Sequence, residues 1–210
     1  MKTDQLVDAL VADGGAASPI ARLLLLALAA GVALSLVVFF LTLGIRPDIG
    51  PALETWRFDL KIVMALLGLV LAFGVCRDCA RPDMPPHPLR RLLPLLALIV
   101  LAVAVELVLV PEAAWRQRLI GSNSLICLPM VPILSLAPLA VVLWMLRRAA
   151  PASPALAGAA AGFMAALSGA TLYAFHCFDD SPLFVATWYS LAVLGMTAVG
   201  AWLGPKLLRW

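Results

Sequence analysis

Six runs of apolar residues divide the chain, and together they predict a membrane protein. Each run approaches the roughly 20 residues that a helix needs to cross a bilayer. The chain is 63% hydrophobic and only 13% charged, which is too little polar surface for a soluble domain of 210 residues. The runs also lack the polar/apolar alternation of a membrane barrel. The sequence therefore predicts an all-α integral membrane protein, a bundle of six transmembrane helices.

The bundle is predicted to occupy residues 20–205, and one charged residue bears on the interpretation of each of two spans. The spans are expected near residues 20–43, 58–76, 89–110, 128–146, 155–176 and 183–203. The second run is the shortest, and it reaches span length only if Lys61 snorkels to the surface. Glu106 lies inside the third run, where a carboxylate faces the interface or pairs with an arginine.

Small residues and prolines modify two of the later spans. Gly158 and Gly162 form a small-xxx-small pattern in the fifth run, which predicts a close helix contact within the bundle or between protomers. The fourth run contains Pro129, Pro132 and Pro138, which remove backbone donors. They predict either an ordinary kink or a soft helix that can switch.

The distribution of Lys and Arg predicts that both termini lie in the cytoplasm. With six spans, the side that holds both termini carries ten of these residues and the other side carries five. Residues 1–19 and 206–210 are therefore assigned to the cytoplasm. A cleaved signal peptide is the alternative for the first run, but the run continues unbroken to Leu43 and follows an acidic tail.

The tail before the first span is predicted to form a short amphipathic helix. Leu6 and Leu10 share one apolar stripe at helical spacing, and Asp4 and Asp8 lie off it. Such a short helix is marginal alone and gains order in the groove of a partner. The alternative is a helix resting on the bilayer, although that role usually uses a basic face.

Two cysteines far apart in the sequence are predicted to meet at the external face. Cys127 opens the fourth span and Cys177 closes the fifth, and a short loop makes these helices antiparallel neighbours. The pair could form a reversible disulfide, or bind a soft metal ion together with His176, Asp179 or Asp180. The alternative is two buried cysteines that act as small hydrophobic residues.

A second pair, Cys76 and Cys79, forms a C-x-x-C motif at the cytoplasmic end of the second span. This motif can be a redox pair or half a zinc site, but reduced structural thiols are favoured in the cytoplasm. No nucleophile–base pair, phosphate loop or nucleotide fingerprint is present, so we expect no enzyme and no constitutive cofactor. The net charge of +3 gives no reason to expect direct nucleic-acid binding.

Several segments together resemble the NrsF family of bacterial integral membrane anti-sigma factors, over essentially the whole chain. The segments are Lys2-Thr3-Asp4 with Leu6 and Leu10, Gly44-Ile45-Arg46-Pro47-Asp48, Cys127, Pro154 to Gly162, Tyr173 to Cys177, Phe184, Trp188-Tyr189 and Leu208-Arg209-Trp210.

The resemblance implies a multi-pass protein of the bacterial inner membrane that restrains an extracytoplasmic-function (ECF) sigma factor. It implies that the N-terminal segment, with Asp4, Leu6, Asp8 and Leu10, holds the sigma factor. It also implies that Cys127 and Cys177 sense metal or oxidative stress, with a soft metal ion bound transiently if at all. The expected partners are the sigma factor and membrane lipid, and a homo-oligomer is compatible with the small-residue pattern.

Two other functions remain open from the residues alone. A membrane thiol–disulfide oxidoreductase needs one cysteine pair to receive electrons and another to pass them on, and here the C-x-x-C lies on the opposite side. A small transporter usually has polar residues deep within several spans, and Glu106 alone is thin support for one.

Overall fold

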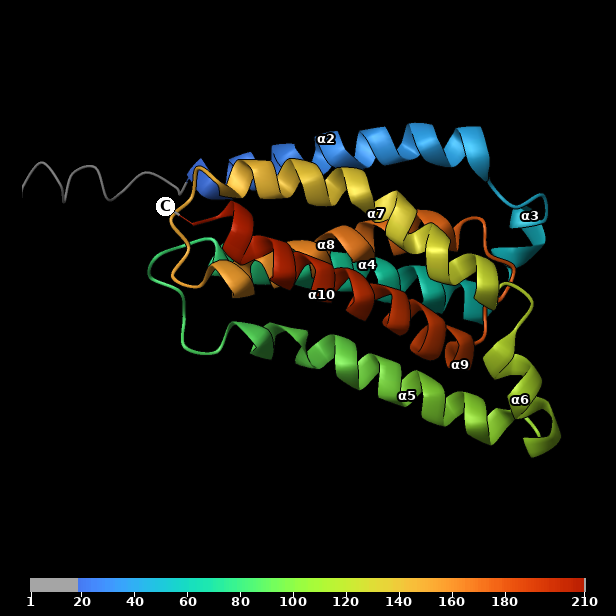
Figure 1. Cartoon of the computed structure of the whole chain (residues 1–210). Coiled ribbons are helices and arrows are strands. Elements are labelled where there is room, and N and C mark those ends of the chain that lie inside the picture. The colour runs from blue at the N-terminus through green and yellow to red at the C-terminus, as the bar shows by residue number, and fades with distance from the viewer. Residues whose placement is uncertain (1–18, 210) are drawn as a thin grey trace, which may run out of the picture.

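The computed structural model describes residues 19–209, and every regular element in that range is helical (Figure 1). The expected tail helix, with Asp4, Leu6, Asp8 and Leu10, lies outside the described residues. The order is α2 (Pro19–Thr42), α3 (Ile49–Ala52), α4 (Trp56–Cys79), η1 (Pro88–Leu92), α5 (Leu93–Leu109), α6 (Glu112–Ile120), α7 (Ser124–Leu146), α8 (Pro154–Ala174), α9 (Pro182–Phe184), the π-helical turn η2 (Val185–Tyr189) and α10 (Ser190–Leu207).

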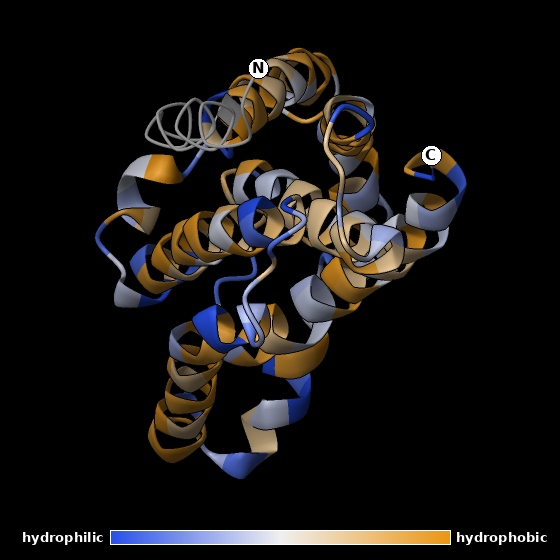
Figure 2. Cartoon of the chain, turned by 90° about the vertical axis from the view of Figure 1, so that its left-hand side faces the viewer, coloured by the Kyte–Doolittle hydropathy of each residue, from blue (hydrophilic) through white to orange (hydrophobic). Residues whose placement is uncertain are grey.

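Six stretches of helix are long and apolar enough to cross a membrane, which confirms the predicted fold class. The second, which the sequence marks as the weakest, is one continuous helix of 24 residues. The fourth stretch begins early because α6 precedes α7, and Gly121, with a φ of 61°, separates the two helices. Viewed along the bundle in Figure 2, apolar residues predominate along the long helices, and hydrophilic residues gather at helix ends and in the loops.

The helix α8 forms the centre of the bundle, and α5 lies at its edge (Figure 1). In the most apolar stretch of each span, 72% of residues are buried in α8, compared with 17% in the span formed by η1 and α5. Contacts along α8 come mainly from α10, α7 and α4, whereas α2 packs chiefly on α7. The prediction that the fourth and fifth spans are neighbours agrees with the long contact between α7 and α8.

The small-xxx-small pattern of α8 makes its contact within the chain. A Cβ atom added at Gly158 would lie 2.2 Å from the carbonyl oxygen of Gly200, and one at Gly162 would lie 2.3 Å from that of Met196. Such distances allow only glycine, so α8 and α10 approach backbone to backbone. Close packing of this kind drives helix association where lipid is as apolar as the side chains.

A proline in α7 leaves one backbone carbonyl without a helical donor, and this carbonyl binds α2. Pro138 is one of three prolines inside α7, and it has no N–H to donate to the carbonyl of Leu134. Ser35 of α2 donates to that carbonyl at 2.6 Å, and both residues are 1% exposed. Gly31 brings α2 close enough for this bond, because a Cβ there would lie 2.4 Å from the Cα of Pro138.

We predict that Gly162→Ala destabilises the bundle and that Gly195→Ala does not. The added methyl at residue 162 must push α8 away from α10, which costs about 1–3 kcal/mol for overpacking. A Cβ at Gly195 meets nothing within 4 Å, so this second variant is a matched control. Thermal unfolding in detergent should show a lower midpoint for Gly162→Ala alone, and equal midpoints would contradict the close packing.

Candidate functional site

The two cysteines predicted to meet, Cys127 and Cys177, lie at one end of the bundle, which we call the thiol end. Cys127 is in the first turn of α7, and Cys177 follows the end of α8 at Ala174. Both side chains are 0% exposed, both are free thiols, and they are close enough to interact electrostatically. The short connection between α7 and α8 therefore brings the two thiols into one buried cluster.

Two tyrosine hydroxyls complete this cluster. The rings of Tyr173 and Tyr189 lie 6.0 Å apart, and each hydroxyl interacts electrostatically with both thiols. Within residues 19–209, neither buried hydroxyl has a hydrogen-bond partner. Both hydroxyls nevertheless lie beside the thiol of Cys177 and interact with it. A phenol donates readily to an anion, so both can donate to a thiolate formed there.

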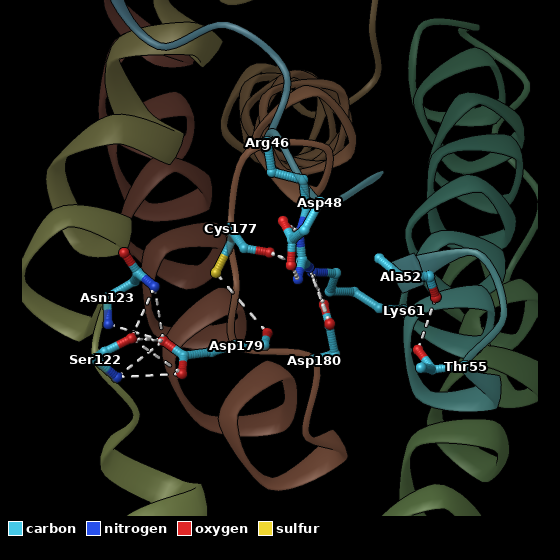
Figure 3. Close-up of polar contacts among 10 residues, drawn as sticks. All are labelled: Arg46, Asp48, Ala52, Thr55, Lys61, Ser122, Asn123, Cys177, Asp179 and Asp180. Atoms are coloured by element: carbon cyan, nitrogen blue, oxygen red, sulfur yellow. Dashed lines mark hydrogen bonds and ion pairs between the residues drawn. The ribbon is translucent and has the colours of Figure 1, made fainter. Parts of the chain in front are cut away.

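Asp179 joins the loop between α8 and α9 (residues 175–181, the Cys177 loop) to the start of α7 (Figure 3). Its carboxylate accepts hydrogen bonds from the backbone N–H of Ser122 at 3.0 Å and of Asn123 at 2.7 Å. It also accepts one from the side-chain amide of Asn123 at 3.0 Å. The N–H of Cys127 in turn donates to the carbonyl of Asn123 at 2.7 Å. The segments that carry the two thiols are thus joined directly.

Two cations hold the backbone of Cys177 from the other side, and Figure 3 shows them converging on its carbonyl oxygen. Arg46 donates to this oxygen at 3.1 Å and Lys61 donates to it at 2.9 Å. Both cations also pair with the carboxylate of Asp180, Arg46 at 2.9 Å. The guanidinium of Arg46 binds Asp48 as well, and this hydrogen bond is the main reason that the pKa of Arg46 is raised.

The snorkelling expected of Lys61 is wrong. Its side chain is 1% exposed and turns inward, because Asp180 and the Cys177 carbonyl supply the partners that a buried ammonium requires. The second span therefore reaches its full length with Lys61 inside the protein.

Glu106 forms a second ionic cluster at the thiol end, as the expectation of an arginine partner anticipated. Its carboxylate is fully buried and accepts from Arg57 at 2.9 Å, from Arg118 at 3.3 Å and from the hydroxyl of Ser181 at 3.1 Å. The arginines come from α4 and α6, so Glu106 ties the peripheral α5 to the bundle.

The other candidate metal ligands are engaged elsewhere. The ring nitrogen Nδ1 of His176 lies 3.0 Å from the carbonyl oxygen of Gly44, and Asp179 binds the start of α7. In the described part of the chain, no three His, Cys, Asp or Glu side chains are grouped to hold one metal ion. A disulfide between Cys127 and Cys177, or a soft ion held by these two sulfur atoms, therefore stays a prediction from the sequence.

The C-x-x-C motif lies at the opposite end of the bundle. Cys76 and Cys79 occupy the last turn of α4, are 0% and 1% exposed, and pack into the apolar core. Asp78 between them accepts from Arg77 at 3.2 Å and from Arg91 at 2.7 Å. The structure does not bring this pair to the thiol end.

Four residues of the site received no role from the sequence, namely Arg46, Lys61, Tyr173 and Tyr189. One sequence signal could have identified Lys61, because it borders an otherwise apolar run and a buried lysine needs a carboxylate. Tyr173 lies one helical turn before Cys177, which local spacing could have indicated. Arg46 and Tyr189 reach Cys177 from segments that local spacing does not relate to it.

Comparisons with known proteins support the resemblance. A family model described as "Negative regulator of sigma F" (NrsF) matches residues 10–210. The chain is 38% identical to the anti-sigma-F factor NrsF of Caulobacter vibrioides and 33% identical to the probable anti-sigma-F factor NrsF of Azospira oryzae. Both alignments cover all of this chain and all of the relative. No solved structure matches the chain significantly.

We predict that Cys177 reacts slowly with alkylating reagents at neutral pH. Burial raises the pKa of this thiol, and nearby Lys61 offsets only part of the effect. Because the thiolate is the nucleophile, iodoacetamide labelling should rise about tenfold per pH unit and should not level off near pH 8.5. The measurement needs Cys76, Cys79 and Cys127 replaced by Ser. Protein unfolded in detergent is the control, and a plateau at or below pH 8.5 in the folded protein would contradict the prediction.

Proposed function

Because the chain belongs to the NrsF family, we propose that it is a membrane-anchored anti-sigma factor that releases its sigma factor when Cys127 and Cys177 react. The observation that carries the sensing role is the convergence of these two buried thiols from separate segments. We further propose that the partner is a sigma factor of the ECF type, as the family resemblance implies, and that the protein has no catalytic role.

The protein spans the bacterial inner membrane six times, with the thiol end outside the cytoplasm. Support comes from the charges at the two ends. Of the five basic residues at the thiol end, four make ion pairs with carboxylates of the same end: Arg46, Arg57, Lys61 and Arg118. At the opposite end, six described basic residues make no ion pair within residues 19–209: Arg22, Arg90, Arg147, Arg148, Lys206 and Arg209. Basic residues are retained on the cytoplasmic side, so this excess favours both termini there.

In the resting state the tail holds the sigma factor. Residues 1–19 precede and begin α2. Their apolar stripe, with Leu6 and Leu10, supplies a surface for a partner groove, and Asp4 and Asp8 beside it attract a basic partner. This arrangement keeps the sigma factor at the membrane and away from RNA polymerase.

The thiols act as the sensor, by one of two reactions. A peroxide accepts two electrons and two protons from Cys127 and Cys177, which leaves a disulfide and either two waters, from hydrogen peroxide, or one water and one alcohol, from an organic peroxide. A soft metal ion instead displaces the two thiol protons and binds both sulfur atoms. The hydroxyls of Tyr173 and Tyr189 beside Cys177 can donate to a thiolate, and both routes pass through a thiolate.

The coupling that this switch needs is small. A tenfold change in affinity for the sigma factor corresponds to about 1.4 kcal/mol. A disulfide typically contributes about 2–4 kcal/mol by restricting the chain, and a metal–thiolate site contributes more. The reaction can shift the equilibrium between the sigma-binding and sigma-releasing conformations only by the difference in free energy of the reacted thiol pair between them.

We predict that deleting residues 1–17 abolishes retention of the sigma factor. The deletion removes the proposed binding surface and leaves all six spans intact. A pull-down from solubilised membranes, with the sigma factor as bait, measures the loss. Unchanged retention by a variant that still inserts in the membrane would refute the role of the tail.

We predict that Cys127→Ser and Cys177→Ser each blunt induction of the sigma regulon by a peroxide or by cadmium. Neither reaction proceeds with a single thiol. Cys76→Ser is the matched control, because it removes an equally buried thiol at the opposite end of the bundle from Cys127 and Cys177. A reporter gene under the sigma factor measures the response. Normal induction in both single variants would remove the two thiols from the mechanism.

A further inference from the structure

We propose that α2 carries the state of the thiol pair to the tail, with Arg46 and Ser35 as positioning residues. This inference rests on the proposed function and supplies its missing step. The helix α2 packs on α7, which carries Cys127 in its first turn, and the residues that directly follow α2 contact the loop that carries Cys177. No other spanning helix leads directly into residues 1–18.

The contacts of α2 are restricted to one narrow stripe. Its buried residues follow helical spacing, and most of the remaining surface is exposed: the stripe comprises Leu24, Ala27, Leu28, Gly31, Ser35 and Phe39. This stripe packs mainly on α7, with few contacts to α8 or α4. A helix held along one stripe can shift as a unit when its few anchors move.

The first anchor joins α2 to the helix that begins at Cys127. Ser35 donates to the carbonyl of Leu134, which the proline at 138 leaves without a helical partner. Gly31 lies against the backbone of Pro138. The bond therefore couples α2 to α7 at the missing helical hydrogen bond, because a bend of α7 at Pro138 moves the Leu134 carbonyl that Ser35 binds.

The second anchor joins the end of α2 to the Cys177 loop. Arg46 donates its backbone N–H to the carbonyl of Phe175 at 3.0 Å and its guanidinium to that of Cys177 at 3.1 Å. Between Thr42, where α2 ends, and Arg46 lie only three residues, and the carbonyl of one of them, Gly44, contacts His176 at 3.0 Å. This short connection has little slack to absorb a movement of the loop.

Reaction of the thiols must disturb both anchors. Drawing the sulfur atom of Cys177 toward Cys127 reorients the peptide that Arg46 holds and pulls on the first turn of α7. With 24 residues at 1.5 Å each, α2 is a rod of about 36 Å that links these anchors to Pro19 at the other end of the bundle. A shift at the thiol end therefore reaches the residue at which the tail begins.

The test measures sigma binding to the full-length protein in nanodiscs, with the thiols reduced and then oxidised by hydrogen peroxide. For the unmodified protein, the dissociation constant should rise at least tenfold on oxidation. For Arg46→Gln and for Ser35→Ala, the two constants should agree within about threefold, although mass spectrometry shows that the disulfide has formed. Arg46→Lys keeps the charge but lacks the planar set of N–H donors of a guanidinium. For this variant the ratio of the oxidised to the reduced dissociation constant should be intermediate.

Arg118→Gln is the matched control, because it removes an arginine of the same end that pairs with Glu106 and touches neither anchor. For this variant, as for the unmodified protein, the dissociation constant for sigma should rise at least tenfold on oxidation. Thermal unfolding identifies variants that fail to fold, and hydrogen exchange along α2 should respond to oxidation in the unmodified protein but not in Arg46→Gln. A full switch in both Arg46→Gln and Ser35→Ala would overturn the α2 route alone. An unmodified protein that forms the disulfide without releasing sigma would overturn the proposed function as well.

Discussion

The structure of the thiol end depends on one buried cation. Lys61 lies within a spanning helix and is 1% exposed, and an ammonium left unpaired there would cost several kcal/mol. Its partners, Asp180 and the carbonyl of Cys177, both come from the loop after α8. The loop must therefore return to α4, and Arg46 joins the same set from the end of α2. One electrostatic requirement thus gathers three segments around the backbone of Cys177.

Packing supplies what the ionic set does not. Lipid gives helices no hydrophobic reason to associate, so contact depends on how closely two backbones can approach. The glycines of α8 and α10 meet this need at the centre, and Gly31 meets it between α2 and α7. The two contacts differ in strength. The α8–α10 contact extends along both helices, whereas α2 follows a single kinked partner. The arrangement gives a closely packed central pair, α8 and α10, and a helix α2 that packs chiefly on one neighbour, α7.

The sequence predicts the spans well because each one is a local property of composition. The six apolar runs, the close contact at Gly158 and Gly162, and the neighbouring α7 and α8 all follow from spacing within short segments. What could not be predicted depends on segments far apart in the chain. The short, polar α6 has no apolar run, and Lys61 was expected at the surface because its partner Asp180 lies 119 residues away. The unused hydroxyls of Tyr173 and Tyr189 become visible only when the burial of each side chain is known.

The two cysteine pairs differ in what a disulfide would demand of the fold. Cys76 and Cys79 are three residues apart on one helix, where Cβ atoms lie about 5–6 Å from each other. A disulfide needs about 3.5–4.5 Å, so oxidation would have to unwind the last turn of α4 inside the apolar core. Cys127 and Cys177 lie on different segments, and Cys177 belongs to a loop that can move without breaking a helix. Oxidation is therefore easier at the thiol end, and its mechanical effect falls on the loop that Arg46 holds.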